Sequence, residues 1–475
     1  MPVRRLKHLP ALAAALMLSA CSLVQYQPLE TLDRIDTRQG YRLHNSLQQQ
    51  SGDEAFIVLM ISGGGSRAAA LGYGVLEALA RQPVHLGSRK RKLADSIDLV
   101  YGVSGGAVLA AYYSLHGADT IPRFEKHFLK QNFQRQVVRQ VFSAANLPRL
   151  TSPEFGRGDL LEEQFETTLF GKATFGDLET SRKGPFAVIS ATDMSAGNRL
   201  DFTQEYFDAM CLDLSRLRLA RAVAASSAVP IIFSPLTLNN HGGNCGYRLP
   251  QRILQTLDSD SGKLQEETRR EFARNLSLYE NSRERPYIHL LDGGLTDNLG
   301  LRSLLDLTEI YPENVLYRQF RQKHIRHIVI INVNAQNQMA SDIDKSAAVP
   351  GLRDVVSALI DIPIDQHSLE TLRRFRAVTD NWNATRHQQP GGTRAHMYFV
   401  SLNLRDLPPS PLRDKVLNIP TRFFLPPDDV NHLKQAAHLL LAQSGEYQRL
   451  LRALSAPPAT IPFPVHASKT QNIEK

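Results

Sequence analysis

The sequence predicts an α/β fold with a mainly parallel sheet flanked by helices. Short, continuous apolar runs recur along the 475-residue chain, as expected for strands that are buried on both faces. Segments with helical spacing of apolar residues separate these runs. Glycine-rich turns join two of the runs directly to the helix that follows, which is typical of sheets built from strand–helix units.

Six segments are predicted to be strands of this sheet. They comprise residues 54–62, 97–103, 185–193, 287–294, 325–335 and 397–404. Charged, turn-poor sequence between them predicts helical insertions near 250–285 and 346–388. A main domain is therefore expected over residues 53–410, followed by a helical C-terminal extension over 411–475. Within the extension, an apolar face that includes Val430 and Leu441 predicts a helix with an aspartate cap at its start and Gly445 at its end.

The first 20 residues have the pattern of an export signal. A basic start precedes an apolar stretch that is too short to span a bilayer. The following "LSAC" resembles the lipobox of bacterial lipoproteins, which implies cleavage before Cys21 and lipid attachment to its thiol. An ordinary secretory signal is the alternative. Ser22 in place of aspartate implies an outer-membrane location facing the periplasm, and the polar residues 21–52 are predicted to form a tether.

Charge and cysteine content narrow the class of protein further. Cleavage would remove three basic groups and lower the net charge from +8 to +5, and no basic–aromatic module indicates nucleic-acid binding. Cys211 and Cys245 then remain as an even pair, for which an exported location permits a disulfide. The sequence alone does not show that they approach. His241 and Cys245 lie in the loop-like "HGGNC", so neither a metal site nor a cofactor is expected.

Three glycine-rich clusters fall at the ends of predicted strands, where open α/β sheets place their sites. In the first, Gly63, Gly64 and Gly65 expose backbone N–H groups at a helix start. Such donors suit a developing oxyanion, although the turn could equally bind phosphate or only reverse the chain. The neighbouring Arg67 is a candidate contact for an anionic head group, but a structural contact with nearby carbonyls is the favoured interpretation.

The second and third clusters supply a nucleophile and a base. Ser104 in "GVSGG" fits a tight strand-to-helix turn that exposes its hydroxyl. Asp292 in "LLDGG" ends an apolar strand, where its carboxylate could accept the serine proton. The alternatives are a serine in an ordinary turn and an aspartate that caps a helix or forms an Asx-turn.

Together with "ASSAVPIIFSP" at 225–235, these blocks resemble the patatin-like phospholipase family in order over residues 54–335. The resemblance implies a Ser104–Asp292 dyad, an oxyanion turn at Gly63, Gly64 and Gly65, and a membrane lipid as the substrate. Ala68 departs from the glycine usual after the first block. Ser226 and Ser227 are interpreted as structural residues before Pro230.

Two rival functions remain open from the sequence. The first is an α/β-hydrolase esterase with a Ser-His-Asp triad, for which His367, His396, His432 and His438 are available. The second is a non-enzymatic lipid-binding envelope protein. Residues 121–142 form either an interfacial helix or a helix that packs its apolar side on the core, and the latter is favoured. The expected partners are a membrane lipid and the membrane itself through Cys21, and the oligomeric state is open.

Overall fold

The fold is taken from a computed structural model that describes residues 24–43, 45, 54–87, 89–249, 264–310, 320, 322–337, 343–388 and 393–454. The predicted signal, Cys21 and the end of the C-terminal extension lie outside these residues. The largest sheet contains eight strands. They are β1 Ala55–Ile61, β4 Leu99–Val103, β5 Phe186–Asp193, β6 Asn198–Asp201, β7 Leu236–Asn239, β8 Tyr287–Asp292, β9 His327–Asn334 and β10 His396–Asn403.

The strand order is β10-β9-β1-β4-β5-β8-β7, with β6 paired to β5. The five strands from β10 to β5 are parallel, whereas β8, β7 and β6 pair antiparallel at the other side. All six strands predicted from the sequence are present, and the mainly parallel α/β class is confirmed. The short β6 and β7 were not predicted, nor was the hairpin of β2 Pro83–Leu86 and β3 Arg89–Lys92.

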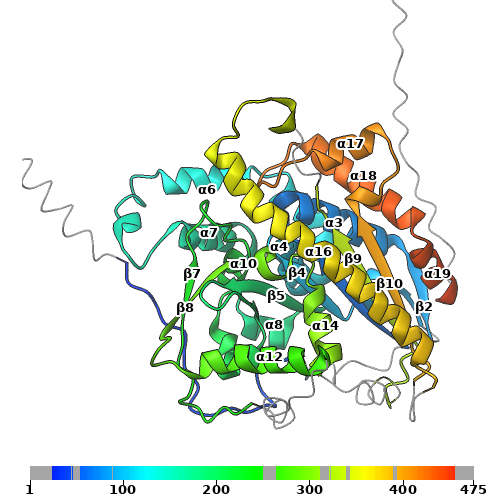
Figure 1. The fold of residues 1–475 in the computed structure, drawn as a ribbon, viewed down its shortest axis with the longest axis horizontal. Helices are drawn as coiled ribbons and strands as arrows, with labels where there is room; N and C mark the ends of the chain where they lie inside the picture. Colours follow the sequence, from blue (N-terminus) through cyan, green and yellow to red (C-terminus); the bar gives the residue numbers. More distant parts are fainter. Residues whose placement is uncertain are drawn as a thin grey trace, which may run out of the picture.

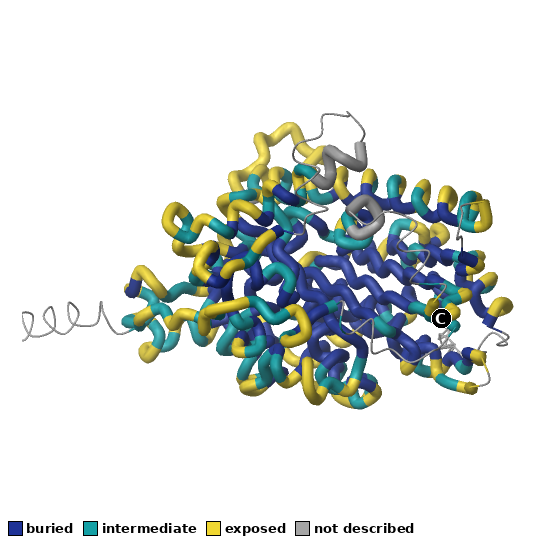
Figure 2. Tube along the Cα trace, turned by 90° about the horizontal axis from the view of Figure 1, so that it is seen from below, coloured by how far each residue is buried: buried dark blue, intermediate teal, exposed yellow. Residues whose placement is uncertain are grey.

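Helices cover both faces of the sheet and bury a continuous apolar core (Figures 1 and 2). The longer helices are α3 Gly65–Arg81, α4 Gly105–His116, α6 Phe133–Val141, α7 Arg157–Phe165, α10 Leu219–Ser226, α12 Leu264–Glu280, α14 Leu301–Ile310, α16 Leu352–Thr385, α18 Pro427–Gln443 and α19 Gly445–Ala453. Shorter ones are α5 Thr120–Phe124, α8 Phe175–Ser181, α9 Gln204–Ala209, α13 Gly294–Asp297 and α17 Pro411–Leu417.

The order of the strands determines where a site can form. The chain runs from β1 through α3 and α4 to β5, and later returns through α14 and α16 to β9 and β10 on the opposite side of β1. Right-handed crossovers in opposite directions place the two sets of helices on opposite faces, and Figure 1 shows α16 crossing in front of the sheet. The crevice at the carboxyl end of β1 and β9, where the direction reverses, is the expected position of a site.

Both predicted insertions contain helices. Residues 250–263 lie outside the described part, and α12 follows them, while α16 is a single helix of 34 residues. The C-terminal extension is helical, and α18 packs so closely on α3 that a Cβ at Gly74 would lie 2.8 Å from Lys434 Cα. The helix ends before Gly445, as predicted: Ser444 is the C-cap of α18. The Ser444 hydroxyl also caps the next helix, α19, which begins at Gly445. Pro426, not an aspartate, precedes α18 as its N-cap.

Part of the segment that was predicted to form a tether is packed on the domain. Residues 24–43 lie against the domain, where Thr31 forms a bridge with Leu212. The Tyr41 ring is buried and stacks on Phe186 at 4.1 Å, and the neighbouring Arg42 forms a buried ion pair with Asp208. The composition of this segment is polar overall, so the sequence did not indicate its few buried side chains. One buried ring and one buried ion pair hold it against the domain.

Cys211 and Cys245 are joined by a disulfide, with their Cα atoms 5.6 Å apart. The predicted 121–142 helix is divided into α5, a π-helical turn at Glu125–Leu129 and α6. Phe124, Phe128 and Phe133 are buried in the core, as favoured, whereas Phe142 is exposed. No helix in the described part of the chain combines the length and apolarity needed to cross a membrane.

Candidate active site

Ser104 occupies a strained turn between the buried strand β4 and helix α4. Its backbone adopts φ 52° and ψ −121°, a conformation that non-glycine residues rarely take and that cores retain only where neighbours enforce it. The following Gly105 is required by packing, because a Cβ there would lie 2.0 Å from the carbonyl oxygen of Gly65. This geometry matches the nucleophile turn expected from "GVSGG".

The Ser104 hydroxyl donates a hydrogen bond of 2.7 Å to Asp292 Oδ2. The second carboxylate oxygen of Asp292 accepts the N–H of Gly294 at 2.8 Å, which fixes the orientation of the carboxylate. Burial raises the pKa of Asp292 to about 6, although the hydrogen bonds from Ser104 and Gly294 oppose this shift. A carboxylate with that pKa is a better proton acceptor near neutral pH than an exposed aspartate.

The glycine turn lies beside Ser104, but its three members have different roles. Gly63 donates its N–H to the Asn298 carbonyl at 3.0 Å, so this N–H is not available to a ligand, contrary to the expectation. Gly64 and Gly65 have φ of 131° and 60° and lie at the start of α3. No described residue accepts their N–H groups in a backbone hydrogen bond. These two N–H groups are therefore the donors that could bind an oxyanion.

Arg67 is a structural residue, which confirms the favoured interpretation over the alternative contact with an anionic head group. Its side chain is buried and donates to the carbonyl oxygens of Ala335 at 2.7 Å and Ile419 at 2.6 Å. These bonds connect the loop after β9 and the segment after α17 to the glycine turn. The guanidinium thus holds the turn in place from behind.

Two residues that the sequence did not single out for the site contribute to it. Ser226 Oγ accepts the N–H of Ser104 at 2.8 Å and donates to the Ser190 carbonyl at 2.6 Å. The Asp292 N–H in turn is bonded to the Ala228 carbonyl at 3.0 Å. The end of α10 and the two residues that follow it therefore hold both Ser104 and Asp292 in position. In the sequence, "ASSA" indicated this only as a run of small residues.

The second is Asn298, whose side chain lies between the glycine turn and Asp292. A Cβ added at Gly63 would lie 2.4 Å from Asn298 Oδ1, so glycine at this position makes room for the amide beside Ser104. The neighbouring Asp297, not Asp292, performs the capping role considered from the sequence, because it accepts the N–H of Arg302 at the start of α14.

None of the four late histidines forms a triad with Ser104. His367 lies on α16, His396 begins β10 at the opposite edge of the sheet, and His432 and His438 lie on α18. None is hydrogen-bonded to Ser104 or Asp292 among the described residues. Within the same residues, no group of His, Cys, Asp and Glu is suited to bind a metal.

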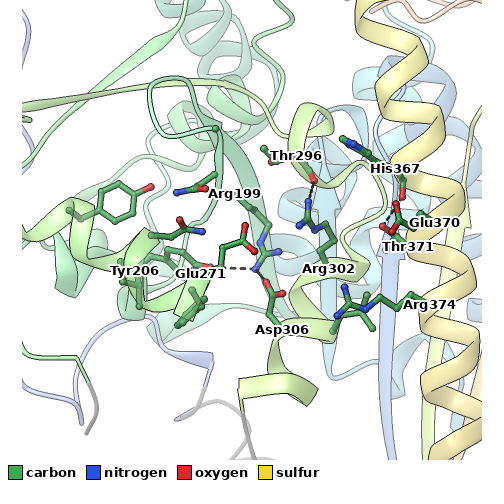
Figure 3. A pocket seen from close by; sticks show the side chains of 17 residues that line it. Arg199, Tyr206, Glu271, Thr296, Arg302, Asp306, His367, Glu370, Thr371 and Arg374 are labelled. Carbon is green, nitrogen blue, oxygen red and sulfur yellow. Dashed lines mark hydrogen bonds and ion pairs between the residues drawn. The ribbon is translucent and has the colours of Figure 1, made fainter. Parts of the chain in front are cut away.

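A cavity of about 280 Å³ lies beside α13, whose Thr296 is one of the residues that line it (Figure 3). It is lined by polar side chains, with Arg199 and Asp306 on one side and His367, Glu370 and Arg374 of α16 on the other. Thr296, which also lines it, contacts Thr192, and Thr192 donates to the Asp292 carbonyl. The cavity is thus a neighbour of the Ser104 site but does not contain it.

A comparison with known protein families gives a match. Residues 59–305, slightly more than half of the chain, match the family model described as patatin-like phospholipase. No curated protein is significantly similar in sequence.

Several solved structures are similar at low identity. Human GIVD cytosolic phospholipase A2 is 12% identical, with a TM-score of 0.44, and the match covers 87% of this chain and 64% of that chain, so the chain spans less than two thirds of it. VipD from Legionella pneumophila is 12% identical with a TM-score of 0.26, covering 90% and 73%. The type III effector protein ExoU is 15% identical with a TM-score of 0.23, covering 85% and 75%.

Proposed function

The chain belongs to the patatin-like phospholipase family, and from this premise we propose that it hydrolyses acyl esters of membrane phospholipids with a Ser104–Asp292 dyad. The observation that carries the proposal is the 2.7 Å hydrogen bond between the two side chains. The donor is a serine in a strained turn, and the acceptor is a buried carboxylate. Burial raises the pKa of this carboxylate to about 6. No rival base contacts the Ser104 hydroxyl among the described residues.

In the first step, Ser104 Oγ attacks the ester carbonyl carbon while its proton passes to Asp292 Oδ2. The carbonyl oxygen becomes an oxyanion, which the N–H groups of Gly64 and Gly65 stabilise at the start of α3. The tetrahedral intermediate then collapses, and Asp292 returns the proton to the leaving alcohol. The product is an acyl ester on Ser104 and a free lysophospholipid.

In the second step, water takes the place of the alcohol. Asp292 accepts a proton from this water, the hydroxide attacks the acyl carbonyl, and the same two N–H groups stabilise the second oxyanion. Return of the proton to Ser104 Oγ releases the fatty acid. Ser226 and Arg67 take no part in these proton transfers but hold the nucleophile turn and the glycine turn in register.

Lipid mass spectrometry tests the proposal directly. Phospholipid vesicles incubated with the purified chain are expected to yield lysophospholipid and free fatty acid in equal amounts. The Ser104→Ala variant should yield neither, and a fluorophosphonate probe should label the parent chain at Ser104 alone. Hydrolysis that persists in Ser104→Ala would refute the assignment, and lipid binding without hydrolysis in the parent would favour the scaffold function.

We further propose that the chain acts as a lipid-anchored protein of a bacterial outer membrane, facing the periplasm. The "LSAC" stretch that ends at Cys21 supports this, and the Cys211–Cys245 disulfide is consistent with export to an oxidising compartment. In a bacterium with two membranes, Cys21→Ala should leave the precursor unlipidated. A Cys21→Ala chain that still carries the lipid mass would exclude the lipoprotein assignment.

A further inference from the structure

Helix α6 has two opposite faces of different character. Phe133 and Val137, four residues apart, are buried, and Phe133 packs on the rings of Phe165 and Phe423. Val138 and Phe142 are also four apart, but they lie on the outer face, with 48% and 75% of their surface exposed. The inner face accounts for the stability of α6 in the domain. The apolar outer face has no such partner within the described chain.

A second exposed apolar pair follows helix α10. Ile231 and Ile232 are 65% and 58% exposed in the loop that leads to β7. Ile231 has φ of 73°, a conformation that is an outlier for a β-branched residue. Because most of the Ile231 side chain is exposed, its burial contributes little to offset the backbone strain. The loop therefore imposes the conformation that directs this side chain outward. Strain of this kind typically accompanies a functional surface.

The segments that carry the two exposed pairs are linked by contacts to the residues around Ser104. The ring of Phe423 contacts both Phe133 of α6 and Phe233 of the loop. The residue before it, Arg422, accepts the N–H of Ser66 next to the glycine turn. At its other end, the same loop begins at Ala228, whose carbonyl holds the Asp292 N–H. In Figure 1, α6 lies along the outer edge of the molecule, beyond α7 and α10.

The charges around this surface are positive. Helix α6 contains no acidic residue, and Arg135 and Arg139 lie on its exposed side, one turn apart and next to Val138 and Phe142. Neither arginine forms an ion pair with a described residue. Arg157 is also exposed and donates to the carbonyl of Ile231. By contrast, the nearby Glu163 is paired with Arg149.

We propose that the outer face of α6 and the Ile231–Ile232 loop together form a docking surface for an anionic phospholipid bilayer. Apolar side chains bordered by arginines are the pattern by which amphipathic helices bind the headgroup region. Docking there would bring the lipid towards the segments that hold Ser104 and Asp292 in position. The inference rests on the proposed function for its substrate, but binding can be measured independently of hydrolysis.

The test is co-sedimentation of the full-length chain with lipid vesicles. All variants carry Cys21→Ala and Ser104→Ala, so neither lipidation nor hydrolysis contributes, and the N-terminal segment is common to all. Phe142→Ser with Ile232→Ser should lower partitioning into vesicles of phosphatidylcholine and phosphatidylglycerol roughly tenfold. Arg135→Gln with Arg139→Gln should lower it about as much at low salt, and the effect should vanish at high salt or on phosphatidylcholine alone.

Matched control variants remove exposed groups elsewhere. Met194→Ser with Leu278→Ser removes two exposed apolar side chains, and Lys90→Gln with Lys92→Gln removes two exposed cations of the β2–β3 hairpin. Both controls should partition like the parent. If the docking variants also partition like the parent, or if the controls lose as much, the proposal is wrong. A second copy of the chain is the other possible occupant of this surface. If Phe142→Ser with Ile232→Ser converts a dimer to a monomer without a change in vesicle binding, the proposal is also wrong.

Two further measurements distinguish a loss of folding, a failure of the proposed hydrolysis and a failure of the docking proposal. Thermal unfolding of the docking variants should match the parent, and Val138→Ser offers a milder third variant on the same face. With Ser104 restored, the docking variants should hydrolyse a soluble short-chain ester at the parental rate. If no chain hydrolyses that ester, the proposed function fails, while the vesicle result still decides the docking surface.

Discussion

Two buried aspartates, Asp292 at the end of β8 and Asp297 at the end of α13, have similarly raised pKa values but different surroundings. Burial raises the pKa of both Asp292 and Asp297 to about 6. Asp297 lies 3.9 Å from Arg199, which also pairs with Asp201 and Asp306, and it caps α14. Asp292 has no cationic partner among the described residues and faces the Ser104 hydroxyl.

The difference shows that a perturbed pKa alone does not identify a catalytic group. At Asp297 an arginine compensates the buried charge, as in many structural clusters. At Asp292 the charge is compensated only by a hydroxyl and one backbone N–H, so its proton affinity is available for transfer to and from Ser104. What separates the two sites is therefore the partner, and substitutions at the two positions should behave differently.

The largest expected difference is in turnover. Asp292→Asn keeps the shape of the side chain but removes the base, and should lower kcat for a p-nitrophenyl ester by about 10³-fold or more. Ser104→Ala should have a comparable effect, and the double variant should be little worse than either one. Asp297→Asn, which keeps the acceptor for the Arg302 N–H, should remain within about tenfold of the parent. Equal losses of kcat at the two positions would show that the partner of the carboxylate does not separate the two sites.

The pH dependence of kcat/KM should report Asp292. The base must be deprotonated to accept the serine proton, so activity is expected above pH about 6 and should fall tenfold per pH unit below it. Asp297→Asn should leave this profile in place, because its carboxylate does not contact Ser104. A profile that stays flat from pH 7 to pH 4 would show that no group with this pKa acts as the base.

The sequence predicted the elements that local pattern determines. All six predicted strands form, because a continuous apolar run bounded by turns leaves few alternatives to a buried strand. Ser104 and Asp292 were chosen as site candidates because the first follows such a strand and the second ends one, and glycines that a tight turn requires come directly after each. The antiparallel β7 and β6 were missed because strands of four residues carry too little periodicity.

The partners of Gly63, Arg67 and Ser226 could not be predicted from the sequence, because each partner lies far along the chain. The Gly63 N–H is used by Asn298, and Arg67 bonds to carbonyls 268 and 352 residues away. Ser226 holds Ser104 from 122 residues along the chain. Which backbone groups remain free for an oxyanion is therefore a property of the folded site and not of the glycine motif.

Ser226 offers a smaller and more selective test of how Ser104 is held. Ser226→Ala removes the acceptor of the Ser104 N–H and should loosen the nucleophile turn, which lowers kcat about tenfold with little change in KM. Fluorophosphonate labelling of Ser104 should slow to the same extent. Ser227→Ala is the matched control, because the adjacent Ser227 hydroxyl is also buried but has no hydrogen-bond partner among the described residues. If both variants lose activity equally, Ser226 has only a general packing role.

The smallest expected effect concerns stability, and at pH 4 it distinguishes the two aspartates. The unfolded chain loses the Asp292 proton near its ordinary pKa of 3.8, whereas the folded chain holds it to about 6. Between these values the folded state binds more protons, so the stability of the parent falls as the pH rises from 4 to 6. Asp292→Asn lacks this loss of stability. At pH 8 its free energy of unfolding should exceed that of the parent by on the order of 1–3 kcal/mol, with little difference at pH 4. The pKa of Asp297 is raised as well, so its removal brings a similar gain at pH 8, but at pH 4 Asp297→Ala should lower the free energy of unfolding by about 1 kcal/mol, because the Arg302 N–H loses its acceptor. Urea titrations at both pH values measure these changes, and an Asp292→Asn chain that is less stable than the parent at pH 8 would contradict the view that this carboxylate is held at a cost to the fold.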